Sequence, residues 1–251
     1  MGESIIQFTT DALVIKEANI GDNDRLITLM TRDMGVIRAF AVGAKSIKSK
    51  RGSATGLLSY SNFHLEKKGD TYRVLEATAN KVFFGAGSDI LILSVAQYFC
   101  ELCAVLGPVD SEGEEFLRLV LNSLYFLTER KRSISLIKAI TELRIATISG
   151  YAPNLLACEG CGKFEDGLMF FKIDDGTLYC SECQYSGAIP IDRTILDSMR
   201  HIVYSEFDKL YSFDIPDDAA KRLTDVTEKY ILYQSEHRFP TLDFYHSIEV
   251  I

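Results

Sequence analysis

The chain has 251 residues, of which 47% are hydrophobic and 25% are charged. It contains no apolar run near the roughly 18 to 20 residues that a membrane-spanning helix needs, and acidic residues stand where a secretory signal peptide has a basic flank. These features argue against a membrane protein and against export, so we expect a globular cytoplasmic protein with a sizeable core.

Charge is distributed unevenly along the chain. The 27 basic and 35 acidic side chains give a net charge of −8. Residues 1–85 hold 12 basic and 9 acidic side chains, which leaves 15 basic and 26 acidic side chains for the rest. This shift near residue 85 coincides with a change in hydrophobic period and predicts two domains.

Residues 1–82 read as a small β domain. Short runs rich in β-branched and aromatic residues alternate with polar turns: DALVIKEANI, DRLITLMT, MGVIRAFAVGA and YSNFHLEKKGDTYRVLEATA. The last run contains a Lys-Lys-Gly-Asp turn, because Gly69 and Asp70 tolerate turn dihedrals, and so predicts a hairpin. Four or five strands in this length predict a small antiparallel barrel, an OB-fold, with a short sandwich as the alternative.

Residues 83–251 have the period of helices, so the overall class is predicted as α+β. A Ser-Asp cap and Gly107 bound the first predicted helix, and Ser111 with Glu114 has capping-box spacing at the start of the second. Gly150 suits the left-handed C-cap of the third. Two further helices are predicted at about 192–204 and 216–237, the latter with Pro216 in its first turn.

A cysteine motif interrupts the helical pattern. Its spacing is C-x2-C-x18-C-x2-C, formed by Cys158, Cys161, Cys180 and Cys183. Paired C-x-x-C turns at this spacing are typical of a structural zinc site, because each turn places two thiolates on one edge of a tetrahedron. We therefore predict an embedded zinc module at 156–186. An iron–sulfur cluster and a redox-active thiol pair are the alternatives.

Cys100 and Cys103 form a third pair of different character. They lie three residues apart in an apolar helical pattern, where a free cysteine behaves as a small hydrophobic residue. We predict that they pack in the core.

The sequence offers no enzymatic motif. GAKS at 43–46 lacks the adjacent Gly-Lys of a phosphate-binding loop, and no nucleophile elbow, zinc-protease or dinucleotide-binding signature is present. With four thiolate ligands the predicted zinc site leaves no open position for catalysis. We therefore expect a protein that is not an enzyme.

A basic stretch is the strongest candidate for a binding site. No acidic side chain occurs between Asp33 and Glu66. The candidate phosphate contacts in this stretch are Arg38, Lys45, Lys48, Lys50 and Arg51. Arg25 and Arg73 are weaker candidates on flanking strands. Small barrels bind single strands with a cationic groove and stacked aromatic rings, so this cluster predicts a DNA-binding face; a solvated loop is the alternative.

The aromatic residues of the neighbouring strands are ambiguous. Phe40, Tyr60, Phe63 and Tyr72 could stack on bases, or could fill the barrel core. A second basic run, Arg130–Arg132, follows a predicted helix, where it could receive an acidic partner tail or complement the helix dipole.

Several quoted segments together resemble the bacterial recombination and repair family RecO. They are GDNDRLITLMTRDMGVIRAFAVGAKSIKSKRG, the GLLSY hairpin region, TELRIATISGYAPNLLACEGCG with YCSEC, and a terminal helix ending RFPTLDFY. The Gly-Tyr-x-Pro sequence that leads into the first cysteine pair is the most specific element. The four cysteines place the chain with the zinc-bearing members.

The resemblance implies an N-terminal OB-fold, a helical domain with a zinc module, and a recombination mediator without enzymatic turnover. It also implies binding of single- and double-stranded DNA near the nucleoid, annealing of complementary strands, and work with RecR and single-strand-binding protein to load RecA. An interaction scaffold with a structural zinc site and only incidental DNA contact is the alternative.

Overall fold

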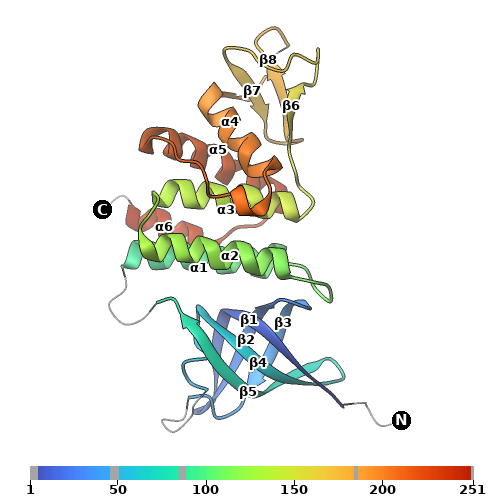
Figure 1. The fold of residues 1–251 in the computed structure, drawn as a ribbon, viewed down its shortest axis with the longest axis vertical. Helices are drawn as coiled ribbons and strands as arrows, with labels where there is room; N and C mark the ends of the chain where they lie inside the picture. Colours follow the sequence, from blue (N-terminus) through green and yellow to red (C-terminus); the bar gives the residue numbers. More distant parts are fainter. Residues whose placement is uncertain (1–4, 46–50, 85–88, 184–185, 250–251) are drawn as a thin grey trace. The chain divides into compact units, whose positions relative to one another are not determined.

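The computed structural model describes residues 5–45, 51–84, 89–183 and 186–249. The chain packs into two compact units, Met1–Thr128 with Phe239–Ile251, and Glu129–Arg238. Together they confirm the α+β class: a five-stranded barrel begins the chain, and helices with a small four-stranded sheet follow (Figure 1). The predicted boundary at residue 82 coincides with the last residue of the barrel, Val82. The division into domains at 1–82 and 83–251 stays a prediction.

The first five strands form a closed barrel. They are β1 (Ile5–Ile20), β2 (Asp24–Thr31), β3 (Gly35–Ala41), β4 (Ser59–Lys68) and β5 (Thr71–Val82). Their order around the barrel is β1-β2-β3-β5-β4, and long β1 pairs with both β2 and β4. This arrangement is the expected OB-fold, and the sandwich alternative is wrong because one sheet closes on itself.

Alternation of side chains along the strands separates the barrel core from its outer face. In β3, Ile37 and Ala39 are buried, whereas the alternate residues Arg38 and Phe40 are exposed. Phe63 of β4 is fully buried and Tyr72 of β5 is 7% exposed, so both are core residues. Among the aromatic candidates, Phe40 at 42% exposure faces solvent.

Helix α1 (Ile90–Leu106) begins after Asp89 and ends before Gly107, as predicted, and Ser88 of the predicted Ser-Asp cap lies outside the described residues. The Asp89 carboxylate accepts from the amide of Leu91 at its start, and Gly107 is its C-cap. Cys100 and Cys103 are 1% and 0% exposed, which confirms that they pack in the core. Burial raises the pKa of both thiols, that of Cys103 to about 12.

Helix α2 (Glu114–Glu129) begins later than predicted. The amide of Leu117 bonds to the carbonyl of Gly113, which places the start of the helix after Gly113 and makes the predicted capping box at Ser111 and Glu114 wrong. The cause is packing: the Gly113 amide donates to the Arg32 carbonyl of the barrel, and a Cβ at Gly113 would lie 2.4 Å from the Thr31 carbonyl oxygen.

The chain end returns to the first unit as a separate helix. Helix α5 (Asp217–Ser235) ends at Glu236, which has a left-handed φ of 48°, and α6 (Pro240–Glu249) then begins. The helix predicted at about 216–237 corresponds to α5, whereas the expectation that the terminal helix ends in RFPTLDFY is wrong, because that sequence lies at the start of α6. Phe239 packs edge-on against Tyr98 of α1, with 5.6 Å between ring centroids.

The second unit joins helices α3 (Ile134–Ile148), α4 (Arg193–Tyr204) and α5, with a short 3-10 turn at Phe207–Lys209. Ser133 caps α3, and Gly150 just beyond its end has the left-handed φ of +92° that was predicted. Asp192 caps α4 at the predicted start. These helix boundaries follow from local capping chemistry.

The same unit contains a four-stranded sheet where no strands were predicted. Its strands are β6 (Asn154–Cys158), β7 (Met169–Lys172), β8 (Thr177–Cys180) and β9 (Ile189–Ile191), in the order β6-β8-β7-β9. The sheet extends beyond the predicted module of 156–186 at both ends. Within the described ranges, the helices are too short or too polar to cross a bilayer.

Candidate metal centre and nucleic-acid interface

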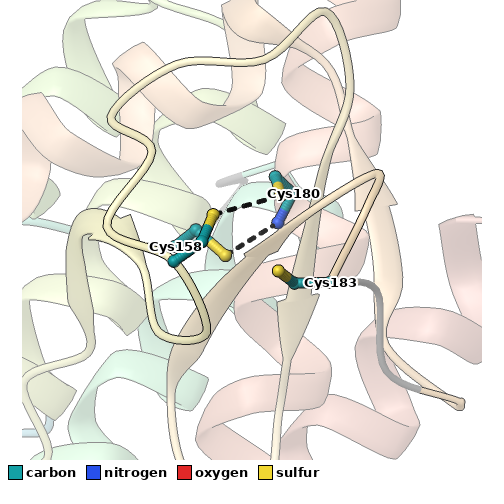
Figure 2. Close-up of side chains that lie close together, drawn as sticks. Cys158, Cys180 and Cys183 are labelled. Atoms are coloured by element: carbon teal, nitrogen blue, oxygen red, sulfur yellow. Dashed lines mark hydrogen bonds between the residues drawn. The ribbon is translucent and has the colours of Figure 1, made fainter.

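The four cysteines of the motif come together at one end of the small sheet. Their Sγ atoms all lie within 4.8 Å of one another, and the Sγ atoms of Cys161 and Cys180 are 3.6 Å apart. A tetrahedral zinc ion with bonds of about 2.3 Å separates its sulfur ligands by roughly 3.8 Å. Figure 2 shows Cys158, at the end of β6, with Cys180, at the end of β8, and Cys183, in the turn that follows, their sulfurs gathered in one place.

Two tight turns hold the sulfurs. In the first, the Cys158 amide donates to the Lys163 carbonyl and the Gly162 amide donates to the Cys158 carbonyl, both at 2.8 Å. Gly162 has a φ of +74°, which favours glycine. A Cβ on Gly160 would lie 3.0 Å from the Cβ of Cys183. Glycine at 160 thus gives the second turn room to approach the first.

Backbone amides surround the sulfur of Cys158. Burial raises the pKa of this thiol, but hydrogen bonds from the amides of Cys180, Cys161 and Gly160 outweigh burial and lower the pKa to about 6. The amide of Cys180 is 3.2 Å from the sulfur. Cys158 is therefore favoured as a thiolate at neutral pH, and thiolate is the form that binds metals.

The Lys163 amide lowers the pKa of Cys161, but hydrogen bonds with Cys180 and Cys158 outweigh it and raise that pKa, and hydrogen bonds with Cys161 and Cys180 raise the pKa of Cys183 to about 12. Metal binding would therefore release protons from these two thiols.

The chemistry of this donor set fits one tetrahedral ion such as zinc. The six cysteines, all within the described ranges, are free thiols, so no disulfide competes for the four sulfurs. Cys158 and Cys180 are buried, Cys183 is partly exposed and Cys161 is exposed. Four protein ligands would complete the coordination of zinc, as in structural sites.

Around this centre, Asp166 fastens the loop to the second turn. Its Oδ2 accepts from the amide and the hydroxyl of Ser181 at 3.0 and 2.6 Å, and the Nζ of Lys163 lies 3.8 Å from the same oxygen. The Ser181 hydrogen bonds lower the pKa of this carboxyl. Such contacts orient the ligand-bearing turns.

The predicted DNA contacts do not all share one environment. Arg38, Lys45 and Arg73 are exposed. Arg25 and Arg51 instead bond to backbone: Arg25 donates to the carbonyl of Gly52 at 2.9 Å, and Arg51 to the carbonyls of Val74 and Leu75 at 3.2 Å each. Lys48 and Lys50 lie outside the described residues.

Strand pairing assembles a cationic and aromatic surface on the barrel. Arg38 and Phe40 point outward from β3, two residues apart. Phe40 pairs with Arg73 of the parallel neighbour β5. A half-exposed ring therefore lies between two exposed guanidinium groups. We call Arg38, Phe40 and Arg73 the barrel triad.

One cation of this face was missed by the sequence reasoning. Lys16 of β1 is paired with Thr28 of β2, which is paired in turn with Arg38 of β3. Neighbouring strands are about 4.8 Å apart, so Lys16 and Arg38 stand at the two ends of a row roughly 10 Å long. The signal is the register between strands, which the sequence alone does not fix.

The comparisons with known proteins agree along the whole chain. The family model described as Recombination protein O N terminal matches residues 5–83, and Recombination protein O C terminal matches residues 87–243. A DNA repair protein RecO of Acetivibrio thermocellus is 31% identical over 96% of this chain and 97% of its own length.

More distant relatives have the same extent. DNA repair protein RecO of Caldicellulosiruptor bescii is 25% identical over 96% of this chain and 98% of the relative. That of Clostridium novyi is 22% identical over 99% of this chain and 98% of the relative. The barrel, the helical part and these matches together place the chain in the RecO family of DNA repair proteins.

Proposed function

We propose that this protein is a recombination mediator that binds single- and double-stranded DNA on the outer face of its barrel and promotes annealing of complementary strands. The observation that carries the proposal is the barrel triad, an exposed phenyl ring between two exposed guanidinium groups on an OB-fold. Family membership supports a role in repair, in which RecR and single-strand-binding protein are the proposed partners for loading RecA near the nucleoid in the cytoplasm.

In this proposal the cations hold phosphates and Phe40 stacks on a base. Each arginine or lysine that neutralises a phosphate releases counterions, which gives affinity without sequence preference. Such contacts on both strands reduce their mutual repulsion and so favour annealing. Lys16 and Lys45 extend the cationic face, and Lys48 and Lys50 are included from the sequence alone.

Arg25 and Arg51 have a different role in the proposal. Arg25 also lies 3.8 Å from Glu17, and its Nη1 is 3.2 Å from the hydroxyl of Thr55. Both arginines thus fasten the loop around residues 51–55 to the barrel. We expect their loss to weaken DNA binding by loosening that loop rather than by removing a phosphate contact.

The zinc proposed for the cysteine centre is structural. One ion bound by Cys158, Cys161, Cys180 and Cys183 would hold the two turns together, and it would leave no ligand position for a substrate. The proposal therefore contains no enzymatic turnover.

The test is strand annealing and DNA binding across a salt series with Arg38→Ala, Phe40→Ala and Arg73→Ala. Each arginine variant should lower the slope of log affinity against log salt by about one, and Phe40→Ala should weaken single-strand binding by about 10-fold. Lys221→Ala is the matched control, because Lys221 is an exposed cation on α5.

The outcomes separate the proposal from the scaffold alternative. Loss of annealing in the three variants and not in the control supports it. If all three variants bind and anneal like the unsubstituted protein, the barrel triad is not the DNA site. Weak binding that ignores salt would favour a scaffold with incidental DNA contact.

A further inference from the structure

The zinc module exposes large apolar side chains that neither the metal centre nor the barrel surface uses. Leu156 is 58% exposed, Phe164 is 55% exposed and Leu168 is 41% exposed. All three belong to the segment that leads into and out of the first cysteine turn. Exposed apolar side chains gathered in one small module are typical of protein–protein contact surfaces.

Arg200 of α4 brings two of them together. Its Nη2 donates to the carbonyl of Leu156 at 3.0 Å and to that of Phe164 at 2.9 Å. The guanidinium carbon also lies 4.2 Å from the centroid of the Phe164 ring. The Arg200 side chain therefore holds the backbone at Leu156 and at Phe164. Its guanidinium group also makes a cation–π contact with the Phe164 ring, about half of which stays exposed to solvent.

A cavity of about 460 Å³ lies beside Arg200, which is one of its lining residues. Met169 and Leu196 are the apolar side chains of its lining. Its charged lining residues are Glu165, Asp166, Asp197, Arg193 and Arg200. Leu168 lies between two lining residues, Gly167 and Met169. The space is ample for one side chain of a partner.

The charge of the small sheet and its loops indicates which kind of partner can bind. Residues 154–191 contain six carboxylates and two lysines. Both lysines are paired with carboxylates: Lys163 with Glu182 at 3.2 Å, and Lys172 with Asp175 at 2.6 Å. A divalent ion on four thiolates would add further negative charge. Asp197, Arg193 and Arg200 of α4 add one carboxylate and two cations beside this segment, so seven carboxylates face four cations. The surface therefore keeps a net negative charge, which disfavours nucleic acid and favours a cationic partner.

The two carboxylates that would receive a new cation already pair with arginine: both pair with the exposed Arg193, and Asp197 also lies 3.9 Å from Arg200. Glu165 lies 3.8 Å and Asp197 lies 3.4 Å from the guanidinium of Arg193, whose side chain is 74% exposed. Exposed ion pairs of this kind contribute about 1 kcal/mol or less, so a partner's lysine or arginine can compete for the same oxygens.

We propose that Phe164, Leu156 and the adjoining cavity form a docking surface for a protein segment that carries an apolar or aromatic anchor flanked by lysine or arginine. The anchor packs on the Phe164 ring and enters the cavity, and the flanking cations pair with Glu165 and Asp197. The inference goes beyond the proposed DNA-binding function, since it assigns the second unit a surface for protein rather than nucleic acid.

The test is selection from a random-sequence peptide display library on the immobilised full-length protein, followed by fluorescence anisotropy with a synthetic peptide of the enriched sequence. We expect enrichment of an apolar or aromatic residue flanked by basic residues. Phe164→Ala should weaken the synthetic peptide by about 10-fold or more, as at interface hot spots. Glu165→Gln with Asp197→Asn should reduce both the affinity and its salt dependence.

Tyr233→Ala is the matched control, because Tyr233 is an aromatic residue of α5 with 54% exposure. Bound metal and circular dichroism measured on each variant separate loss of docking from loss of fold. Enrichment of acidic peptides, or affinity unchanged in Phe164→Ala, would overturn the proposal. So would a self-association that Phe164→Ala abolishes, or a loss of DNA binding in that variant, since the occupant would then be a second copy or nucleic acid.

Discussion

Lys138 of α3 is a fully buried lysine held by two carboxylates. Its Nζ lies 2.7 Å from Glu142 Oε1 and 2.6 Å from Glu228 Oε2, and the Thr227 hydroxyl donates to the other Glu142 oxygen at 2.7 Å. Burial raises the pKa of Glu142, while the carboxylates keep Lys138 charged despite its burial. This network ties α3 to α5 through charges that cannot be removed singly without cost.

Lys138→Met should therefore destabilise the second unit strongly. The substitution leaves Glu142 buried without its cation, for which the expected loss in the free energy of unfolding is about 3 to 5 kcal/mol. Urea unfolding followed by circular dichroism measures it. Lys221→Met on the surface of α5 is the control and should change stability by about 0.5 kcal/mol or less. A loss below about 1 kcal/mol in Lys138→Met would mean that the network is not a main support of this unit.

Asp192 joins two helices at the surface. Its Oδ1 accepts from the amide of Ile195 at the start of α4, and its Oδ2 contacts the guanidinium of Arg222 on α5. Burial alone would raise the pKa of this carboxyl, but the Arg222 contact and the helix amides outweigh it and lower the pKa. The lowered value makes its contribution to stability depend on pH.

Because the folded pKa lies below the ordinary value of about 3.9, this contribution is present above about pH 4 and is lost as pH falls through the folded pKa. Asp192→Asn keeps the cap and removes the charge. The variant should be less stable by about 1 kcal/mol or less at neutral pH, since the pair is partly exposed, and the difference should shrink below about pH 4. A stability difference that does not change with pH would contradict the assignment.

At the scale of elements, the C-terminal helix α6 belongs to the first unit, although it is the last element of the chain. The Glu101 carboxylate of α1 accepts hydrogen bonds from the amide of Thr241, at 3.1 Å, and from the Thr241 hydroxyl. Phe239, which packs on Tyr98 of α1, is only 1% exposed. Helix α1 thus depends on residues more than a hundred positions away.

Phe239→Ala should loosen α1 and leave α5 unaffected. Removal of this ring creates a cavity beside Tyr98, for which the expected cost is about 3 to 5 kcal/mol. Amide hydrogen exchange should then show faster exchange in α1, with unchanged protection in α5. Phe244→Ala in the same helix is the control, because that ring is 45% exposed. Equal loss of protection in both helices would show that the two units do not open separately.

The elements that the sequence predicts are those specified by nearby residues. Caps such as Asp89, Ser133 and Asp192 mark helix starts because the partner amides lie two or three residues away. Strands β6 to β9 were not predicted, because each is only three to five residues long. Such short strands show little alternation of polar and apolar residues, and their pairing depends on the neighbouring turns. Helix α6 was not predicted as a separate element, because the left-handed break before it falls at Glu236 rather than at a glycine.

The candidate sites divide in the same way. The four cysteines were found by spacing, which is a local property, and the structure brings their sulfurs together. The DNA face was found only in part, because its composition depends on register. Arg25 reaches Gly52, and Arg51 reaches Val74, across loops whose path the sequence does not reveal. Lys16 joins the face only through the pairing of three strands.

At the scale of the whole molecule, the two units separate the proposed activities. The barrel triad belongs to Met1–Thr128 with Phe239–Ile251, and the cysteine centre belongs to Glu129–Arg238. A structural metal contributes its binding free energy to the fold of the segment that it holds, and local parts of a protein can open without global unfolding. Removal of the metal should therefore affect one unit and leave the other intact.

We expect one zinc per chain by elemental analysis, and loss of the module's fold on chelation. A strong chelator, or Cys161→Ser, should expose the amides of β6 to β8 to hydrogen exchange and abolish docking at Phe164, while single-strand affinity changes less than about 2-fold because the barrel stays folded. Cys100→Ser is the control for cysteine loss without metal loss, since that thiol is buried in α1. If chelation removes DNA binding as well, the metal supports the barrel, and the proposed division of labour between the units is wrong.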